Sequence, residues 1–172
     1  MQLTTSRKAV AALTISLAGL TGIWMHEGFT DKAVIPVKGD RPTIGHGSTF
    51  REDGTPVQMG DTITKVQAEK RSRLHIQKDE ARLKPCFPDG VELSQVEWDI
   101  IVDFSYQYGV AATCKSGMVR NYKIGNYEAA CYVYPLYKYG PGWFDCSTPG
   151  NRICPGVHTR NLKRQSKCLE AL

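Results

Sequence analysis

The sequence has no cysteine before Cys86, and no two of its cysteines have the C-x-x-C spacing. Zinc and thiol redox sites commonly use that spacing, so neither kind of site is indicated. The chain also lacks a phosphate-binding glycine loop, a low-complexity tract, a repeat of fixed period and an interleaved basic and aromatic motif for nucleic acid. We therefore expect no cofactor, no metal and no nucleic-acid partner.

The cysteines that are present all lie in the second half of the chain. An even number without metal-binding spacing favours disulfides and an oxidising compartment. Buried free thiols in a cytosolic protein are the alternative, because a free cysteine is often simply a small core residue. Cys146 and Cys154 are close enough in sequence to close a small loop, and the other pairings stay open. The six residues are Cys86, Cys114, Cys131, Cys146, Cys154 and Cys168.

The composition is that of an ordinary globular protein. The chain has 172 residues, of which 41% are hydrophobic and 23% are charged, and this excludes a disordered chain. The length is sufficient for one domain, or for two lobes that share a core. The formal net charge of +5 favours an anionic partner but does not select nucleic acid, anionic lipid or cell wall.

An uncharged run from Ala9 to Met25 follows two basic residues, as in the basic and apolar regions of an export signal. Nine of its 17 residues are Ala, Gly, Ser or Thr, and as a helix it would span only about 25 Å of a ~30 Å hydrocarbon core. The run is therefore a cleaved signal, a permanent anchor, or a weak signal-anchor that later leaves the membrane. A buried helix is the remaining alternative, because Leu13, Leu17 and Leu20 would form one apolar face.

Two segments predict the structure that follows. Val34 to Thr49 is rich in Gly, Pro and β-branched residues, which indicates a short β-hairpin or small sheet. Thr64 to Leu83 contains no Gly or Pro and carries charges of both signs, which predicts a long, largely exposed helix. Its intermittent apolar stripe consists of Val66, Leu74, Ile76 and Leu83.

The second half of the chain is expected to be helical. Ser94 and Glu97 form an S-x-x-E capping box before a nearly apolar segment, and Gly109 stands where a helix C-cap is expected. That helix should be the core of the second lobe. Shorter helices are expected at Lys115–Tyr122, Asn126–Tyr134 and Val157–Leu169.

The residues that could carry chemistry lie between Glu27 and Gly47. Glu27 would end the apolar helix, where partial loss of hydration favours the protonated carboxyl that a general acid needs. Asp40 and Thr43 lie on or beside the hairpin and could face Glu27 across a groove. Glycoside hydrolysis needs such an acid and a second group that positions water or stabilises the oxocarbenium ion. Without other support the pattern is weak, because a Glu after an apolar helix is most often a solvated cap.

These residues resemble the phage lysozymes of glycoside hydrolase family 24, whose pattern is E-G, then D, then T-I-G-x-G. The corresponding residues here are Glu27-Gly28, Asp40 and Thr43-Ile44-Gly45-His46-Gly47. The later segments WDIIVDFSYQYG, MVRNYKIGNYEAAC and PGVHTRNLKRQSKC are similar to the family's core helix and its two closing elements. The resemblance extends over about residues 24 to 169.

The resemblance implies an α+β, lysozyme-like fold, with a small α/β lobe that holds a β-hairpin, a larger helical lobe, a long helix that joins them, and a cleft between. It implies an endolysin that hydrolyses the β-1,4 bond between N-acetylmuramic acid and N-acetylglucosamine in peptidoglycan and lyses the host cell. Glu27 would be the acid, with Asp40 and Thr43 opposite. A lytic transglycosylase and a non-enzymatic wall-binding protein of the same fold are the alternatives. We expect a monomer whose basic C-terminal helix suits anionic wall polymers.

One spacing departs from the family pattern. The family has eight residues between the Glu and the Asp, whereas twelve separate Glu27 from Asp40 and two separate Asp40 from Thr43. Asp40 is therefore a displaced candidate for the second carboxylate. Asp31 is the other candidate, although its position four residues after Glu27 predicts that it continues the same helix edge.

The small-residue N-terminal segment is similar to that of the signal-anchor-release endolysins. The resemblance implies a signal-anchor over residues 1–25 and a lysozyme domain over residues 26–172. Such a protein is exported to the host periplasm and is at first tethered to the inner membrane, here through residues 9–25. Some members of that group keep a cysteine in the anchor that exchanges disulfides on activation, but this segment has none. The enzyme would therefore be kept inactive before release by its position alone, with Glu27 held beside the bilayer and the cleft unformed.

Overall fold

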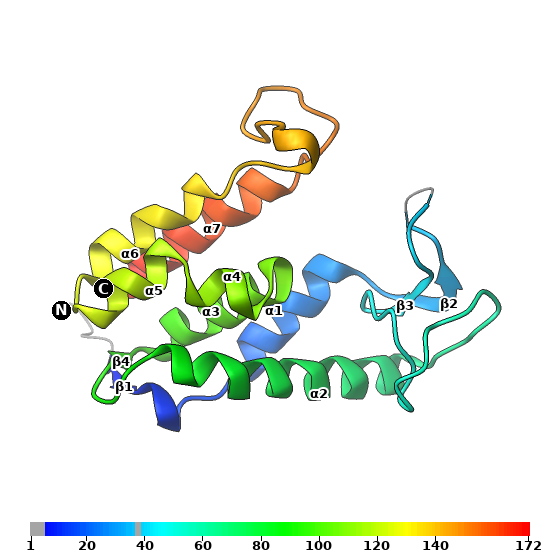
Figure 1. Cartoon of the computed structure of the whole chain (residues 1–172), viewed down its shortest axis with the longest axis horizontal. Helices are drawn as coiled ribbons and strands as arrows, with labels where there is room; N and C mark the ends of the chain where they lie inside the picture. Colours follow the sequence, from blue (N-terminus) through cyan, green and yellow to red (C-terminus); the bar gives the residue numbers. More distant parts are fainter. Residues whose placement is uncertain (1–5, 37–38) are drawn as a thin grey trace.

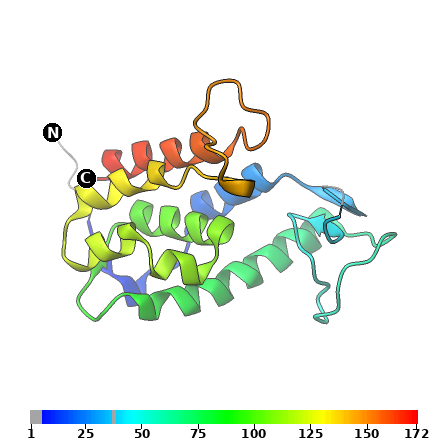
Figure 2. The same ribbon diagram turned by 45° about the horizontal axis from the view of Figure 1, so that its top comes forward.

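The computed structural model describes residues 6–36 and 39–172 and consists of two lobes. Both views show a helical lobe and a smaller lobe with a β-hairpin, which lie at opposite ends of the long helix α2 (Figures 1 and 2). The fold class is thus the predicted one. The helices are α1 (Leu17–Glu27), α2 (Lys65–Leu83), α3 (Gln95–Tyr108), α4 (Val110–Cys114), α5 (Gly117–Lys123), α6 (Tyr127–Val133) and α7 (Val157–Glu170). The strands are β1 (Lys8–Ala9), β2 (Thr30–Val34), β3 (Thr43–Gly45) and β4 (Glu92–Leu93).

The predicted hairpin is confirmed, but it begins earlier in the chain than Val34. β2 and β3 pair antiparallel, with Thr30 opposite Gly45 and a change of register before Val34. The hairpin closes over a small apolar cluster with the start of α2. Gly45 has φ +68°, and a Cβ there would lie 2.9 Å from the Cβ of Ala68, so only glycine allows this approach. The cluster consists of Ala33, Ile44, Val57, Ile63 and Ala68.

The predicted long helix is α2, which begins at a capping box. The Thr64 hydroxyl accepts from the Gln67 N–H, and the Gln67 side chain accepts from the Thr64 N–H. The predicted apolar stripe is only half right. Ile76 and Leu83 are buried, but Val66 and Leu74 are exposed, since they lie off the face that α2 turns inward. The buried face runs through Ala68, Ser72, Ile76, Asp79, Glu80 and Leu83.

The buried face of α2 also contains a carboxylate, that of Glu80. Glu80 is 4% exposed, and its Oε1 accepts from the Trp98 indole at 2.8 Å and from the Ile15 N–H at 2.6 Å. Both donors are needed, because an ionised carboxylate without partners is costly to bury. Glu80 thereby joins α2 to α3 and to the chain that enters α1.

The core helix α3 begins and ends as predicted. The Ser94–Glu97 capping box is present, and Gly109 caps the helix at φ +84°. The Glu97 carboxylate is fully buried and accepts two hydrogen bonds from Arg7, at 2.9 and 3.2 Å. α5, α6 and α7 match the predicted shorter helices, whereas α4, which starts directly after Gly109, was not predicted.

The N-terminal segment is helical only in its second half. β1 pairs with β4, a 3-10 turn follows, and α1 begins after Ser16, whose hydroxyl accepts from the Gly19 N–H. Val10, Leu13, Leu20 and Ile23 are buried in the core of the helical lobe. The predicted apolar face is wrong at Leu17, which is 70% exposed because it occupies the first turn of α1 on the side away from the core.

The described residues contain no helix of the length and apolar character needed to cross a bilayer. The predicted domain boundary between residues 25 and 26 falls within α1. That boundary stays a prediction.

The six cysteines form three disulfides, so the free-thiol alternative is wrong. Cys146–Cys154 closes a small loop, as expected. Cys86–Cys114 links the chain after α2 to α4. Cys131–Cys168 links α6 to α7 inside the core.

If the N-terminal segment stabilises the helical lobe, replacing either of two leucines of α1 by alanine should change the free energy of unfolding by very different amounts. Leu20→Ala should lower the free energy of unfolding by about 2–5 kcal/mol, because it leaves a cavity in the core. Leu17→Ala removes the same atoms from an exposed position and should cost less than about 0.5 kcal/mol. Urea denaturation measures both, and equal losses would contradict the described packing of α1.

Candidate active site

Glu27 is the last residue of α1 and lies where the two lobes meet. Gly28 ends the helix at φ +71°, and its N–H donates to the Trp24 carbonyl at 3.1 Å. The chain then turns directly into β2, so the carboxylate stands at the end of the helix. Across from it, a Cβ on Gly47 would lie 3.9 Å from Glu27 Oε2. The absence of a side chain at Gly47 leaves this face of the carboxylate open.

The Glu27 carboxylate is held by α7. Arg160 donates from Nη1 to Glu27 Oε1 at 3.0 Å and from Nη2 to Asp103 Oδ1 at 2.6 Å. One planar guanidinium therefore bridges a carboxylate of α1 and a carboxylate of α3. The side chains of Arg160 and Glu27 are 12% and 26% exposed, so the guanidinium is largely covered while the carboxylate stays partly open to water.

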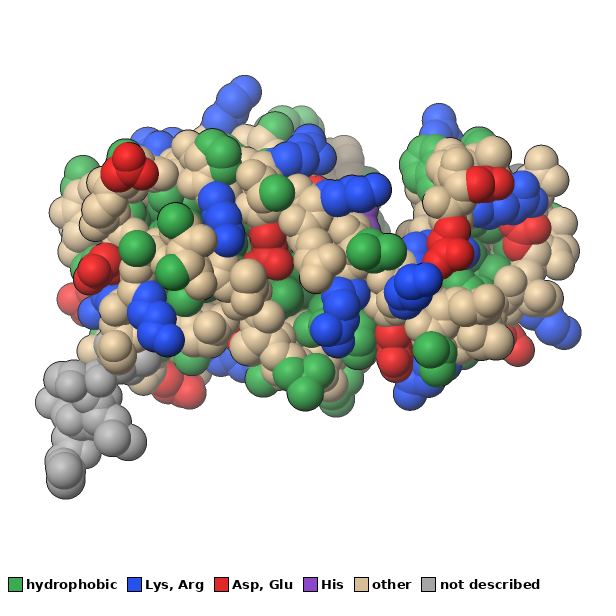
Figure 3. Space-filling view, turned by 90° about the horizontal axis from the view of Figure 1, so that it is seen from below, with side chains coloured by type: hydrophobic (Ala, Val, Ile, Leu, Met, Phe, Trp, Pro, Cys, Tyr) green, Lys and Arg blue, Asp and Glu red, His purple; other side chains and the backbone are tan. Residues whose placement is uncertain are grey.

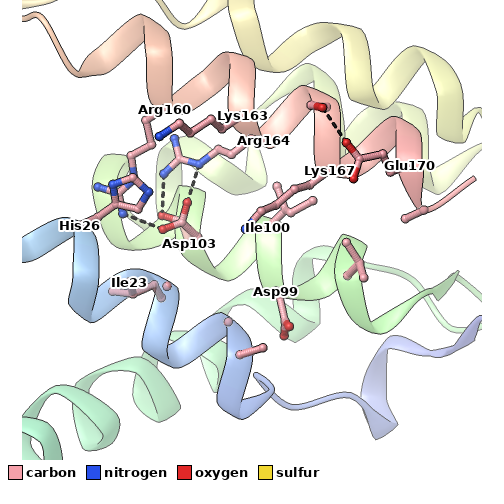
Figure 4. Close-up of a pocket in the computed structure, with 16 residues that line it drawn as sticks. Ile23, His26, Asp99, Ile100, Asp103, Arg160, Lys163, Arg164, Lys167 and Glu170 are labelled. Carbon is pink, nitrogen blue, oxygen red and sulfur yellow. Dashed lines mark hydrogen bonds and ion pairs between the residues drawn. The ribbon is translucent and has the colours of Figure 1, made fainter.

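Asp103 lies between two arginines of α7, as Figure 4 shows. Arg164, which is 3% exposed, donates from Nε to Asp103 Oδ2 at 2.6 Å and from Nη1 to the Gln107 side chain at 2.8 Å. Burial alone would raise the pKa of Asp103, but the adjacent Arg164 and Arg160 outweigh it and lower that pKa below its usual value. Two carboxylates and two guanidiniums thus compensate one another's charge.

His46 fastens the hairpin lobe to the helical lobe. Its ring stacks on Trp24 with 5.6 Å between centroids, and Nδ1 lies 2.5 Å from the Gly28 carbonyl oxygen. Its own carbonyl accepts from the Tyr106 hydroxyl of α3 at 2.9 Å. Burial above all, and then the charge of Glu27, raises the pKa of Tyr106. His46 is therefore a packing residue that joins the hairpin to α1 and α3 beside Glu27.

A cavity of about 250 Å³ lies between the lobes. The hairpin side contributes His46 and Gly47, and the helical side contributes Ser72 and His75 of α2 and Tyr106 of α3. Figure 3 shows a notch between the two lobes, with Lys and Arg side chains on both sides of it. Because Gly47 lines this cavity and faces Glu27, a polymer bound between the lobes would pass the carboxylate.

A second groove, of about 700 Å³, lies between α1, α3 and α7 on the side drawn in Figure 4. Ile23 and Ile100 form part of its wall, and Lys163 and Lys167 line it from α7. Partial burial, and then the Arg160 charge, lowers the pKa of His26, which also lines it. Arg160 thus reaches from this groove to the carboxylate at the junction of the lobes.

The structure places the other predicted site residues on or beside the hairpin. Thr43 begins β3, and its hydroxyl donates to the Val34 carbonyl at 3.4 Å. Asp40 is exposed in the turn before β3. Asp31 does not continue the helix edge, because α1 ends at Glu27 and Asp31 lies in β2. Within residues 6–36 and 39–172, no hydrogen bond or ion pair joins Glu27 to any of these three, so the identity of the second carboxylate stays a prediction.

The partners of Glu27 were not predicted from the sequence. The last helix was expected to offer its basic residues to anionic wall polymers, but Arg160 and Arg164 point inward to Asp103. Of the basic residues of α7, Lys163 and Lys167 are the exposed ones. One signal was available: Asp103 interrupts an apolar core helix, and a buried carboxylate requires a cationic partner. Across the described ranges, no three His, Cys, Asp or Glu side chains are grouped so that they could hold a metal ion.

The fold and the site together define a two-lobed α+β protein with a single glutamate presented where a helix ends against a β-hairpin. The model of the family described as "Phage lysozyme" matches residues 25–163 of this chain. The chain belongs to the phage lysozyme family.

Individual endolysins and lysozymes are also similar to this chain in sequence and in structure. The endolysin of Salmonella phage P22 is 33% identical over 128 residues, which is 73% of this chain and 84% of that protein. An endolysin from Escherichia coli O157:H7 phage FAHEc1 has a similar structure, with a TM-score of 0.77, 25% identity and coverage of 94% of this chain and 96% of that one. The crystal structure of a P22 lysozyme mutant is also similar, with a TM-score of 0.75, 25% identity and coverage of 91% of this chain and 99% of that one.

The Asp103 cluster predicts a specific dependence of stability on pH. Because the pKa of Asp103 is lower in the folded chain, its ionisation stabilises the fold above the unfolded value of about 3.9, and this contribution is lost as pH falls through the folded pKa. Asp103→Asn should lower the free energy of unfolding by about 3 kcal/mol near pH 6, since it leaves buried guanidinium charge unpaired.

At low pH the protonated aspartic acid resembles the amide. The difference between the wild type and Asp103→Asn in guanidinium chloride denaturation should therefore shrink steadily below about pH 3. A difference of constant size from pH 6 to pH 2 would show that Asp103 does not act through its charge.

Proposed function

We propose that this protein is an endolysin that cleaves peptidoglycan as a monomer, by hydrolysis of the β-1,4 bond between N-acetylmuramic acid and N-acetylglucosamine. One observation carries the proposal. The Glu27 carboxylate is fixed by Arg160 at the junction of the lobes, with its other oxygen open toward Gly47 and the cavity between the lobes. A carboxyl in that position can give its proton to the leaving oxygen of a bound glycan.

Arg160 is the positioning residue for Glu27. A guanidinium that donates to a carboxylate fixes the direction of that carboxylate and places a positive charge beside it. Asp103 is the nearer partner of Arg160, at 2.6 Å against 3.0 Å for Glu27, and it offsets that charge. The guanidinium therefore orients Glu27 while Asp103 compensates its charge.

The hairpin supplies the groups that would act opposite Glu27 in the reaction. Asp40 is the proposed second carboxylate and Thr43 the hydroxyl that helps to hold the attacking water. Support comes from their adjacency, because Asp40 lies in the turn that leads into β3 and Thr43 is the first residue of that strand. A lytic transglycosylase would need only Glu27, since the substrate's own hydroxyl would replace water. The exposed position of Asp40 is the observation that favours this second candidate.

We also propose that the chain is exported to the host periplasm and is at first tethered to the inner membrane through residues 9–25. The three disulfides are consistent with an oxidising compartment. In the folded chain, Leu13, Leu20 and Ile23 are core residues, so they cannot face lipid at the same time. Tethering would therefore keep the helical lobe incomplete and Glu27 out of place until release.

Glu27→Gln should lower the rate of lysis of chloroform-treated cells by at least about 100-fold, because an amide of the same shape has no acidic proton to give. Binding to purified peptidoglycan, measured by co-sedimentation, should be unchanged. The matched control is Glu128→Gln on the exposed side of α6, which should lyse like the wild type. Unchanged lysis by Glu27→Gln would instead favour a wall-binding protein without activity.

Separate Asn substitutions test the assignment on the hairpin. Asp40→Asn should reduce lytic activity about tenfold or more, because it removes the charge next to Thr43. Asp31→Asn should leave activity near that of the wild type, since the Asp31 carbonyl, which the substitution retains, makes its hydrogen bond to Ile63. Equal activities of the two variants would reject Asp40 as the second carboxylate.

A further inference from the structure

Residues 138–154, which we call the stapled loop, carry Trp143, the most exposed aromatic side chain among the described residues. Residues 138–146 form a small hairpin, in which the Cys146 N–H donates to the Lys138 carbonyl at 2.7 Å and the Gly140 N–H donates to the Phe144 carbonyl at 2.9 Å. Trp143 lies at its tip and is 84% exposed. The loop therefore presents a large apolar ring to solvent.

The tip is rigidly built. The Cys146–Cys154 disulfide ties the returning strand to the chain that enters α7. Lys138 donates to Asp145 at 2.7 Å across the hairpin, and this hydrogen bond is the largest of the causes that lower the pKa of Asp145 to about 2. A Cβ on Gly140 would lie 2.9 Å from both disulfide sulfurs, so the tip packs directly on the staple.

The backbone at Trp143 is strained. Its φ is +61°, and it is the one non-glycine residue with positive φ in the described ranges. Bulky side chains rarely adopt this conformation, and strain of this kind is concentrated at functional sites. A residue that only filled space at the tip would not need both the strain and the exposure.

The loop is anchored to the turn of α7 that holds the catalytic glutamate. The Asn161 side chain donates to the Tyr137 carbonyl at 2.6 Å, where the loop begins. At the other end, the Val157 N–H donates to the Cys154 carbonyl at 3.2 Å. Arg160, the neighbour of Asn161, holds Glu27. Figures 1 and 2 both show the loop at the end of the helical lobe where α1 also ends.

We propose that Trp143 is a binding residue for a sugar ring of the glycan strand, outside the bond that Glu27 cleaves. The proposal rests on the proposed function and names an additional part of its substrate site. The apolar C–H face of a pyranose carries slight positive charge and suits the negative face of an indole. Tyr139, with its ring centroid 6.2 Å from that of Trp143 and tilted to it, flanks the same site.

The rigid presentation explains how an exposed ring can contribute to binding. An aromatic side chain has few rotatable bonds, and a stapled backbone removes further freedom before the ligand arrives, so little entropy is lost on contact. The stacked sugar would hold the strand in place while its next units run past Glu27.

The test measures binding apart from catalysis, in the Glu27→Gln background. Trp143→Ala should weaken co-sedimentation with purified peptidoglycan about five- to tenfold, and Trp143→Phe should restore part of the loss. Tyr132→Ala removes an aromatic ring that is 53% exposed on α6 and should bind like the parent. Thermal denaturation should be nearly unchanged for all of these variants, because the substituted side chains lie outside the core.

Intrinsic fluorescence gives a second measurement. Trp98 is buried and Trp24 is half-buried, so Trp143 is the tryptophan whose emission a ligand on the surface can change most. A soluble oligomer of N-acetylglucosamine should shift the emission to shorter wavelength, and Trp143→Phe should abolish the shift. Unchanged binding of peptidoglycan by Trp143→Ala would overturn the proposal, and so would an emission shift that survives in Trp143→Phe.

The outcomes separate this proposal from the proposed function. Full lysis by Glu27→Gln would refute the enzyme mechanism, whatever Trp143 does. Loss of lysis by Glu27→Gln with normal wall binding by Trp143→Ala would refute only the sugar site. Vesicles of anionic phosphatidylglycerol test another occupant: if Trp143→Ala loses binding to vesicles but keeps binding to peptidoglycan, the ring serves a membrane surface and the sugar site is wrong.

Discussion

The bridge that Arg160 makes between Glu27 and Asp103 is the interaction on which the site depends. It connects the end of α1 to α3 through α7, three helices that are far apart in sequence. Arg164 completes the cluster on the buried side, so each charge has a partner. Removal of Asp103 would leave Arg164 without a carboxylate partner, and removal of Arg160 would leave Glu27 without a cationic one. The orientation of the proposed acid is therefore tied to the integrity of the helical lobe.

The smaller lobe is held near Glu27 by a different set of contacts. His46 stacks on Trp24, one turn before Glu27, and its backbone accepts from Tyr106 of α3. Trp24 belongs to α1 and Tyr106 to α3, so these contacts place the hairpin relative to both helices, in addition to its connection through α2. The N-terminal segment enters the same arrangement, because α1 carries Leu20 and Ile23 into the core and Glu27 at its end. The packing of α1 in the core therefore also sets the position of Glu27.

Local features of the sequence predicted much of this fold. The capping box at Ser94, the uninterrupted segment before Leu83 and the glycine-rich hairpin act over a few residues, so their patterns are legible. The ion-pair cluster is different, since Arg160 is 133 residues from Glu27 and 57 from Asp103, and no period in the sequence links them. Leu17 was misplaced because helical spacing alone does not show which side of a helix the core covers. Asp31 was misplaced because its position was counted along the helix, although the helix was already predicted to end at Glu27.

The central claim is that Glu27, held by Arg160, cleaves the glycan by hydrolysis, and the chemical identity of the products tests it most directly. Purified peptidoglycan should be digested with the wild-type protein in water enriched in heavy oxygen, and the released muropeptides analysed by mass spectrometry. The account predicts N-acetylmuramic acid ends that are free to be reduced and carry one heavy oxygen from water. Muropeptides that end in the 1,6-anhydro sugar, without incorporated oxygen, would contradict it and show that Glu27 serves a transglycosylase.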